Sequence, residues 1–222
     1  MPWALEPALK TPLAYLYDII CDIPGLMEDA RDLQKPELDT TQRTLSHQTL
    51  SRNIFDHLNQ LHVWRSRWKD ENRNSCYEIQ APQQLGKQPL FPAVLYFSNP
   101  AQAYELLRYN IALILLLRLG VEIMGSAFNA SSAVLGLPTE STNLQAISME
   151  ICKCVDYCLA DNRKGGGVSL LVALRTAYTA FPPTSRQAKW VDAAISRVEE
   201  LNGFEINKNI DSYTLNLCSS TI

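Results

Sequence analysis

Charged and phenolic side chains interrupt several otherwise apolar segments of this chain. Arg118 and Glu122 follow one apolar run, and Arg175 and Tyr178 lie in another. A buried arginine or tyrosine that faces a cavity can donate a hydrogen bond to a carbonyl or phenolate oxygen, and so stabilise charge that develops during a reaction. Such groups assist cyclisations and isomerisations that use no cofactor. We therefore predict catalytic roles for His62, Arg118, Arg175 and Tyr178.

Each catalytic interpretation has a structural alternative. Arg118 and Glu122 are four positions apart, so they form an ion pair if both lie on one helix. His62 lies beside an apolar stripe, where it serves either as a proton-transfer group or as a partly buried histidine with a hydrogen-bond partner. His57 and His62 cannot jointly bind a metal ion, because they are separated by about 140° around a helix axis.

A second set of residues is predicted to contact a ligand. Aromatic rings from neighbouring helices would hold a polyketide or terpenoid in a folded conformation, and polar groups among them would orient it. Packing in the protein core is the alternative for each aromatic residue. The predicted ligand-binding residues are Trp64, Trp68, Tyr104, Arg108, Tyr109, Glu122, Asp156 and Tyr157.

The motifs of common enzyme classes are absent from the sequence. No serine lies in a Gly-x-Ser-x-Gly turn, and neither a His-Glu-x-x-His motif nor a dinucleotide-binding fingerprint occurs. The glycine triplet 165–167 follows Lys164, whereas a phosphate-binding loop has its lysine after the glycines, so we interpret the triplet as an interhelical turn. On a helix, Cys152 points about 160° away from Cys154, and these two with Cys158 cannot complete a tetrahedral zinc site. We expect no metal and no cofactor.

The composition limits the possible partners and compartments. Charged residues make up 19% of the chain and the net charge is −3, which gives no general attraction to nucleic acid. Nine uncharged residues separate Arg108 from Arg118. They span about 14 Å of helix against the roughly 30 Å of a bilayer, so we expect no membrane span. The N-terminal residues do not resemble a secretion signal. We expect an intracellular protein, cytoplasmic or nuclear.

The elements that position these residues are predicted to be helices. Segment 101–124 is apolar on every side at its centre, which is typical of a helix surrounded by other helices. A long helix ending near Asp70 is predicted from apolar residues at steps of three and four. Its inward stripe consists of Leu50, Ile54, Leu58, Leu61, Trp64 and Trp68.

Other boundaries follow from proline, glycine and capping residues. Pro24 predicts a break near Ile23, so the first segment, 13–33, is expected to be a helical pair or a kinked helix. Segments 71–92 and 126–141 are predicted to be loops, the former with at most a short element.

Three further helices are predicted beyond residue 141. They are a helix from Thr142 or Asn143 to about Leu159, a short helix after the glycine triplet, and a last helix that begins at Ser185 and ends at Gly203. No alternating strand pattern persists. We therefore predict an all-α fold of six or seven helices packed around helix 101–124, with residues 1–222 forming a single domain.

Several short motifs lie in a characteristic order along residues 13–207. They are Asp22-Ile23-Pro24-Gly25-Leu26, Trp64-Arg65-x-x-Trp68, Phe91-Pro92, Phe97-Ser98, Tyr109-Asn110, Leu113-Ile114-Leu115-Leu116, Ile151-Cys152, Tyr157-Cys158-Leu159, Leu174-Arg175-x-Ala177-Tyr178 and Gly203-Phe204-Glu205-Ile206. In this order they resemble the regulatory middle domain of fungal binuclear zinc-cluster transcription factors.

The resemblance implies a helical regulatory protein and leaves two functions open. Members of the family read DNA through six cysteines that hold two zinc ions, but this chain has no C-x-x-C pair, so we expect no direct DNA binding. The first function is binding or conversion of an apolar metabolite of fungal secondary metabolism, for example by a cofactor-independent cyclase or isomerase. The second is co-regulation by pairing with a full-length zinc-cluster regulator, and a homodimer is also considered.

Overall fold

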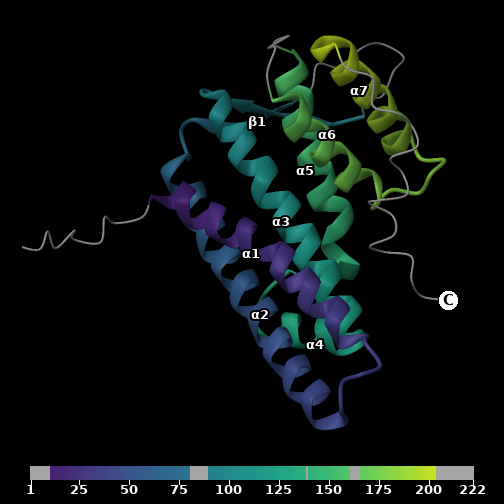
Figure 1. Cartoon of the computed structure of the whole chain (residues 1–222). Helices are drawn as coiled ribbons and strands as arrows, with labels where there is room; N and C mark the ends of the chain where they lie inside the picture. The colour runs from purple at the N-terminus through teal and green to yellow at the C-terminus, as the bar shows by residue number, and fades with distance from the viewer. Residues whose placement is uncertain (1–10, 81–89, 139, 161–165, 204–222) are drawn as a thin grey trace, which may run out of the picture.

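Seven α-helices and a two-stranded antiparallel sheet form the part of the chain that a computed structural model describes, residues 11–80, 90–138, 140–160 and 166–203 (Figure 1). Helix α3, Pro100–Met124, lies in the middle and contacts α1, α2, α5 and α6. Buried leucines and isoleucines project from every side of its central turns: Leu106, Leu107, Leu113, Ile114, Leu116 and Leu117. The predicted all-α fold around this central helix is confirmed.

Helix α1, Pro12–Leu33, is a single continuous helix, so the predicted alternative of two helices separated near Ile23 is wrong. Pro24 lies within the helix on its exposed side. Its ring removes one backbone hydrogen bond, but Ile23 and Leu26 on either side of it remain buried against the core. Burial of the inward face therefore offsets the cost of proline here.

Helix α2, Thr40–Glu71, begins at Asp39, whose carboxylate accepts a hydrogen bond of 2.8 Å from the amide of Gln42. The predicted inward stripe of this helix is confirmed: all six of its residues are buried. In Figure 1, α1 and α2 lie next to each other on one side of α3. Trp64 and Trp68 lie in the last turns of α2, close to the start of α3.

Strands β1, Cys76–Gln80, and β2, Ala93–Phe97, pair as a small antiparallel sheet. β1 is a short element within the segment 71–92, as the prediction allowed, whereas β2 was not predicted. Each strand is only five residues long and has Pro82 or Pro92 close to one end. The alternation of apolar and polar side chains is therefore too short to distinguish a strand from a loop in the sequence. Contact with α5 buries Phe97 and Leu95 on the inner face of β2.

Helix α4, Ser126–Val134, occupies most of a segment predicted to be a loop. Only Phe128 and Ser132 of this helix are buried, so the sequence carries almost no helical periodicity. Phe128 stacks on Phe55 with ring centroids 5.5 Å apart, and its ring packs directly against Gly120, where any side chain would collide with it. Tertiary packing of one aromatic ring thus holds α4 in place.

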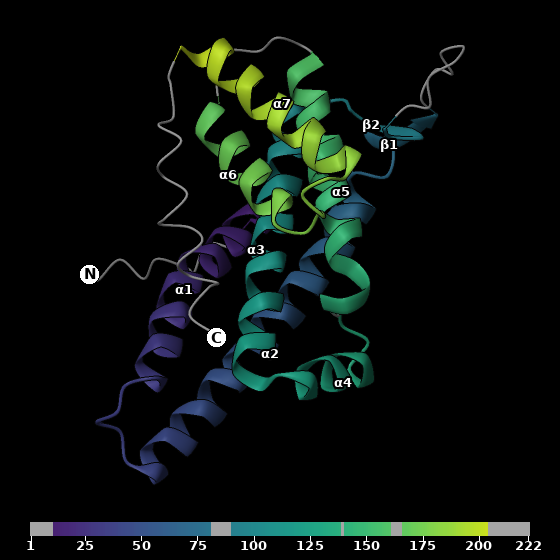
Figure 2. The same cartoon turned by 90° about the vertical axis from the view of Figure 1, so that its right-hand side faces the viewer.

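Helices α5, Glu140–Ala160, α6, Gly167–Tyr178, and α7, Arg186–Asn202, form the other side of the bundle (Figure 2). Ser185 caps α7 by accepting a 3.0 Å hydrogen bond from the amide of Ala188, and Gly203 ends the helix with a φ of 67°, as predicted. No described helix contains an apolar stretch long enough to cross a bilayer.

Candidate functional site

A depression of about 300 Å³ lies where the end of α2 meets the starts of α1 and α3. Trp64, Trp68 and Glu105 line it, together with the amide side chains of Asn72 and Gln102. Its volume is at the lower end of the range of small-molecule sites, and aromatic groups with a few polar groups are the usual lining of such sites. We call this depression the tryptophan site.

Both indoles of the tryptophan site are held rigidly. The Nε1 of Trp64 donates a 2.8 Å hydrogen bond to the carbonyl oxygen of Pro12, and the Nε1 of Trp68 donates one of 2.8 Å to Oε2 of Glu105. The two rings stack with centroids 6.1 Å apart, and Trp64 also stacks on Tyr109 at 5.4 Å. Because each indole is only 4% exposed, a ligand would meet the ring edges.

An amide network forms one wall of the tryptophan site. Nδ2 of Asn72 donates a 2.8 Å hydrogen bond to the carbonyl oxygen of Trp68 and so closes the end of α2. Nε2 of Gln102 donates to Oδ1 of Asn72 and to Oγ of Ser75, the latter at 2.7 Å. Gln102 also belongs to the capping box of α3. The same residues therefore end one helix, begin the next and fix the wall between them.

A partly buried cluster of charged and polar groups packs against the two indoles. Nη2 of Arg65 lies 2.6 Å from Oε1 of Glu150, and the other carboxylate oxygen of Glu150 accepts a 2.9 Å hydrogen bond from Nδ2 of Asn110. The guanidinium of Arg65 lies over the rings of Trp68 and Tyr109, 5.0 and 5.5 Å from their centroids. This cluster joins α2, α3 and α5 and supports the tryptophan site from behind.

Sequence reasoning missed Glu105, Glu150 and Asn110, and gave Arg65 no role in a site. A glutamate on an apolar helix has no specific local signal, because its partner lies elsewhere in the sequence. The one available signal was the buried position of Asn110 on the uniformly apolar α3, where a polar side chain requires a partner.

The ring of Tyr109 contacts both the indole of Trp64 and the guanidinium of Arg65. Burial raises the pKa of Tyr109 to about 12, although the nearby positive charge of Arg65 opposes this shift. The phenol is therefore neutral across the physiological range. It contributes an aromatic surface and not a base.

We expect the raised pKa of Tyr109 to make the fold lose stability at alkaline pH. An unfolded tyrosine loses its proton near pH 10, whereas the folded one keeps it to about pH 12, so stability is full below pH 10 and falls between the two values. Tyr109→Phe should remove about 1–3 kcal/mol of this loss. Urea unfolding of the wild type and of Tyr109→Phe at pH 8 and pH 11 measures this loss of stability. An equal loss in the two proteins would contradict the role given to Tyr109.

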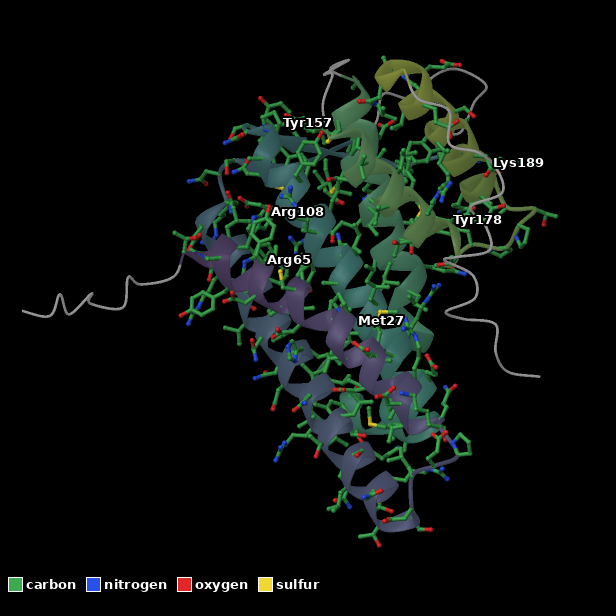
Figure 3. The ribbon with its side chains drawn as sticks, viewed as in Figure 1. Met27, Arg65, Arg108, Tyr157, Tyr178 and Lys189 are labelled. Carbon is green, nitrogen blue, oxygen red and sulfur yellow. The ribbon has the colours of Figure 1, made fainter. Side chains whose placement is uncertain are left out.

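Tyr104, Arg108, Glu122, Asp156 and Tyr157 do not line the tryptophan site. Figure 3 labels Arg108 and Tyr157. The guanidinium of Arg108 lies 5.3 Å from the ring centroid of Tyr17 on α1. Tyr104 packs against Gly166 at the start of α6. The hydroxyl of Tyr157 donates a 2.7 Å hydrogen bond to the carbonyl oxygen of Phe97, which attaches the hairpin to α5.

Asp156 lies next to Tyr157 on α5 and is partly buried. Burial raises the pKa of its carboxyl group, and the charge of Arg197 opposes the shift. Neither depression described here includes Asp156.

The four predicted catalytic residues are not brought together at either depression. His62 is exposed on α2. Arg118 donates through Nη2 to Oγ1 of Thr179, and Arg175 and Tyr178 are half-buried on α6. The alternative of an Arg118–Glu122 ion pair is not what the structure shows, because Glu122 instead accepts a 3.4 Å hydrogen bond from Gln34.

The three neighbouring cysteines on α5 are all buried. Burial raises the pKa of Cys152 to about 12 and that of Cys154 well above its usual range, so both thiols keep their protons. Metals bind the thiolate form. Across the described ranges, no three His, Cys, Asp or Glu side chains are grouped so that they could hold a metal ion.

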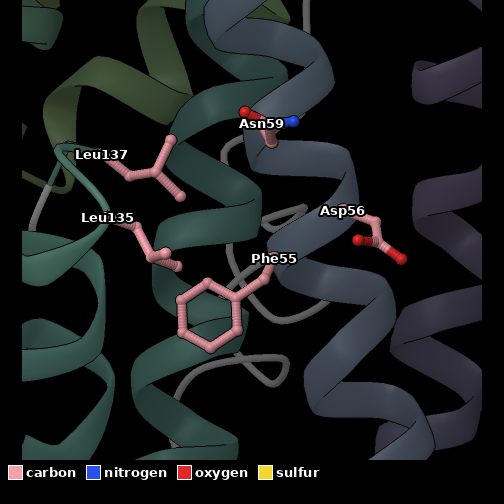
Figure 4. Close-up of a pocket in the computed structure, with 5 residues that line it drawn as sticks. All are labelled: Phe55, Asp56, Asn59, Leu135 and Leu137. Atoms are coloured by element: carbon pink, nitrogen blue, oxygen red, sulfur yellow. The ribbon is translucent and has the colours of Figure 1, made fainter.

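A second depression of about 290 Å³ lies between α2 and the connection from α4 to α5 (Figure 4). Phe55, Asp56 and Asn59 contribute one side, and Leu135 and Leu137 contribute the other. None of the predicted site residues lines it.

Searches of protein-family models, curated proteins and solved structures find no match to this chain. The resemblance to fungal zinc-cluster regulators therefore remains a prediction.

Proposed function

We propose that this protein binds an apolar small molecule of the terpenoid or polyketide class in the tryptophan site. One observation carries the proposal: the depression combines the edges of two indoles with the carboxylates of Glu71 and Glu105 and with fixed amide groups. No arginine, lysine or histidine is among the residues that line it. A ligand with hydroxyl or amine donors therefore fits better than a carboxylate, which the two glutamates would repel.

The geometry supports binding better than conversion of the ligand. Glu105 is one candidate for proton transfer, but Oε2 of its carboxylate already accepts the hydrogen bond from Trp68. His62, Arg118, Arg175 and Tyr178 do not line the tryptophan site. Catalysis requires reacting groups to converge on one ligand. We therefore propose a binding protein that uses no metal or cofactor. The cyclase or isomerase function is the less favoured alternative.

Calorimetric titration with farnesol, a terpenoid alcohol, and emodin, a phenolic polyketide, tests the proposal. We expect at least one of these probes to bind. Glu105→Gln should then weaken binding about 10-fold, because a hydrogen bond to a charged acceptor contributes about 1.5 kcal/mol or more. Asp56→Asn, in the second depression, is the matched control and should leave the affinity unchanged. Lack of binding by both probes, or equal effects of the two substitutions, would contradict the proposal.

A second function, co-regulation by pairing with a zinc-cluster regulator, is favoured by the surface of α4. Val134 is 86% exposed and Leu135 is 60% exposed, and Leu135 borders the second depression. Adjacent exposed apolar residues beside a groove are typical of protein contacts. Co-purification with a full-length regulator that is lost in Val134→Asp and retained in Glu105→Gln would favour this function over ligand binding.

A further inference from the structure

One edge of β1 has no neighbouring strand among the described residues. In an antiparallel pair, the backbone N–H and C=O groups of successive residues point alternately toward the neighbouring strand and away from it. The amide of Ser98 donates a 2.8 Å hydrogen bond to the carbonyl oxygen of Ser75, which places position 75 among the bonded residues. Because this alternation repeats every second residue, the backbone groups of Tyr77 and Ile79 also point toward β2. The backbone groups of Glu78 and Gln80, and the carbonyl of Cys76, therefore face the open edge.

The two faces of β1 differ in character. On the outer face, Tyr77 is 48% exposed and Ile79 is 42% exposed, and the ring of Tyr77 lies 5.0 Å from that of Tyr96 on β2. On the inner face, the carboxylate of Glu78 lies 2.6 Å from Nζ of Lys153 on α5. An open edge beside exposed aromatic and β-branched side chains is a template for another strand.

We propose that two copies of this chain dimerise by antiparallel pairing of their β1 strands about a two-fold axis at Glu78. Each Glu78 amide then donates to the Glu78 carbonyl of the other copy, and each Gln80 amide donates to the opposite Cys76 carbonyl. The Cys76 amide is not needed, since it already donates to the carbonyl oxygen of Asn72 at 2.9 Å. The two hairpins become one four-stranded sheet.

The side chains of β1 are self-complementary in this register. Tyr77 lies opposite Ile79 of the second copy, and the reverse pair forms on the other side of the axis. These residues occupy non-hydrogen-bonded positions, where side chains approach most closely, and aromatic rings beside β-branched residues are favourable cross-strand pairs. The pairing covers exposed apolar side chains on both copies.

The two Glu78 carboxylates approach each other at the axis, and this is the one unfavourable contact. Each of them has Lys153 as its own counter-ion at 2.6 Å, so the repulsion is largely cancelled within each copy. Figure 2 shows the hairpin on the side of the bundle opposite α1. With strands of only five residues the interface is small, so we expect a dissociation constant in the micromolar range.

Analytical ultracentrifugation of the full chain between about 1 and 100 µM tests the dimer. The wild type should pass from monomer to dimer over this range. Glu78→Pro should remain monomeric, because proline lacks the amide that bonds across the axis, and an edge strand tolerates proline where that amide faces outward. Glu78→Thr is the control: it also loses the contact with Lys153 but keeps the amide, and should still dimerise. Circular dichroism checks that all three remain folded.

Disulfide cross-linking tests the register. Bonded partners of an antiparallel pair have Cα atoms about 5.5 Å apart, which a disulfide can bridge. In Glu78→Cys, the two new thiols should form an intermolecular disulfide and pass two electrons and two protons to oxidised glutathione. Tyr96→Cys, on the other strand, should cross-link far less. A wild type that stays monomeric at about 100 µM, a dimer that survives Glu78→Pro, or equal cross-linking of the two cysteine variants would overturn the proposal.

Discussion

Leu117→Ala should lower the free energy of unfolding by about 3–5 kcal/mol, the largest effect we expect from one substitution. Leu117 is completely buried in the middle of α3, which contacts helices on several sides. Truncation removes apolar contacts and leaves a cavity that the surrounding helices cannot fill without moving. Urea unfolding followed by circular dichroism measures the change.

Leu45→Ala is the matched control for Leu117→Ala. The same chemical change is made in the first half of α2, where Leu45 is 59% exposed, and we expect a cost below about 0.5 kcal/mol. If the two substitutions had similar effects, α3 would not be the centre of the core.

Glu150→Ala should lower the free energy of unfolding by about 2–3 kcal/mol. The substitution removes the partner of Arg65 and the acceptor for Asn110 together, and it leaves the guanidinium partly buried without its counter-ion. Burial is not complete, since the side chains of Arg65 and Glu150 are 27% and 28% exposed, so the effect is smaller than for a fully buried pair. Urea unfolding at neutral pH and moderate salt measures it.

Asp32→Ala is the control for this ion pair. Asp32 and Lys35 are also 2.6 Å apart, but their side chains are 53% and 58% exposed. Solvent screens an exposed pair and so weakens it, and we therefore expect little change in the free energy of unfolding. A similar loss of unfolding free energy in Glu150→Ala and Asp32→Ala would mean that the Arg65–Glu150–Asn110 cluster stabilises the fold no more than an exposed ion pair does. Arg65→Met combined with Glu150→Leu should recover much of the stability lost in Glu150→Ala, because an apolar pair needs no counter-ion.

The helical core was predictable because its signals are local. The stripe on α2 from Leu50 to Trp68 and the apolar residues around α3 follow directly from the spacing of side chains along a helix. Asp39, Asn99 and Ser185 cap three helices with their own side chains, and Gly203 ends one with a positive φ. Each of these features depends on residues within a few positions of one another.

The errors arise where distant residues decide the local structure. α4 depends on Phe128 meeting Phe55 and Gly120, and the hairpin depends on two five-residue strands finding each other across an intervening segment. Pro24 indicated a break, but the packing of Ile23 and Leu26 keeps α1 continuous. None of these three features can be predicted from a short window of sequence.

The candidate site was predicted only in part, for the same reason. Trp64 and Trp68 were identified because aromatic residues at helical spacing stand out in a sequence. Glu105 and Glu150 were not, because their partners lie on other helices: Arg65 and Glu150 are 85 positions apart. Arg118 and Arg175 were selected as charges in apolar segments, but both are only partly buried and neither lines a described depression.

Quenching of tryptophan fluorescence by bromodecanol, an apolar alcohol with a heavy atom that quenches indole on contact, tests the tryptophan site most directly. The measurement is made in Trp3→Phe/Trp190→Phe, which leaves Trp64 and Trp68 as the two tryptophans of the chain. Trp190 packs against Phe91 away from the site. We predict saturable quenching in this variant and none in Trp3→Phe/Trp64→Phe/Trp68→Phe, in which Trp190 is the remaining indole. Quenching that rises linearly without saturation, or that persists without these two indoles, would contradict the account.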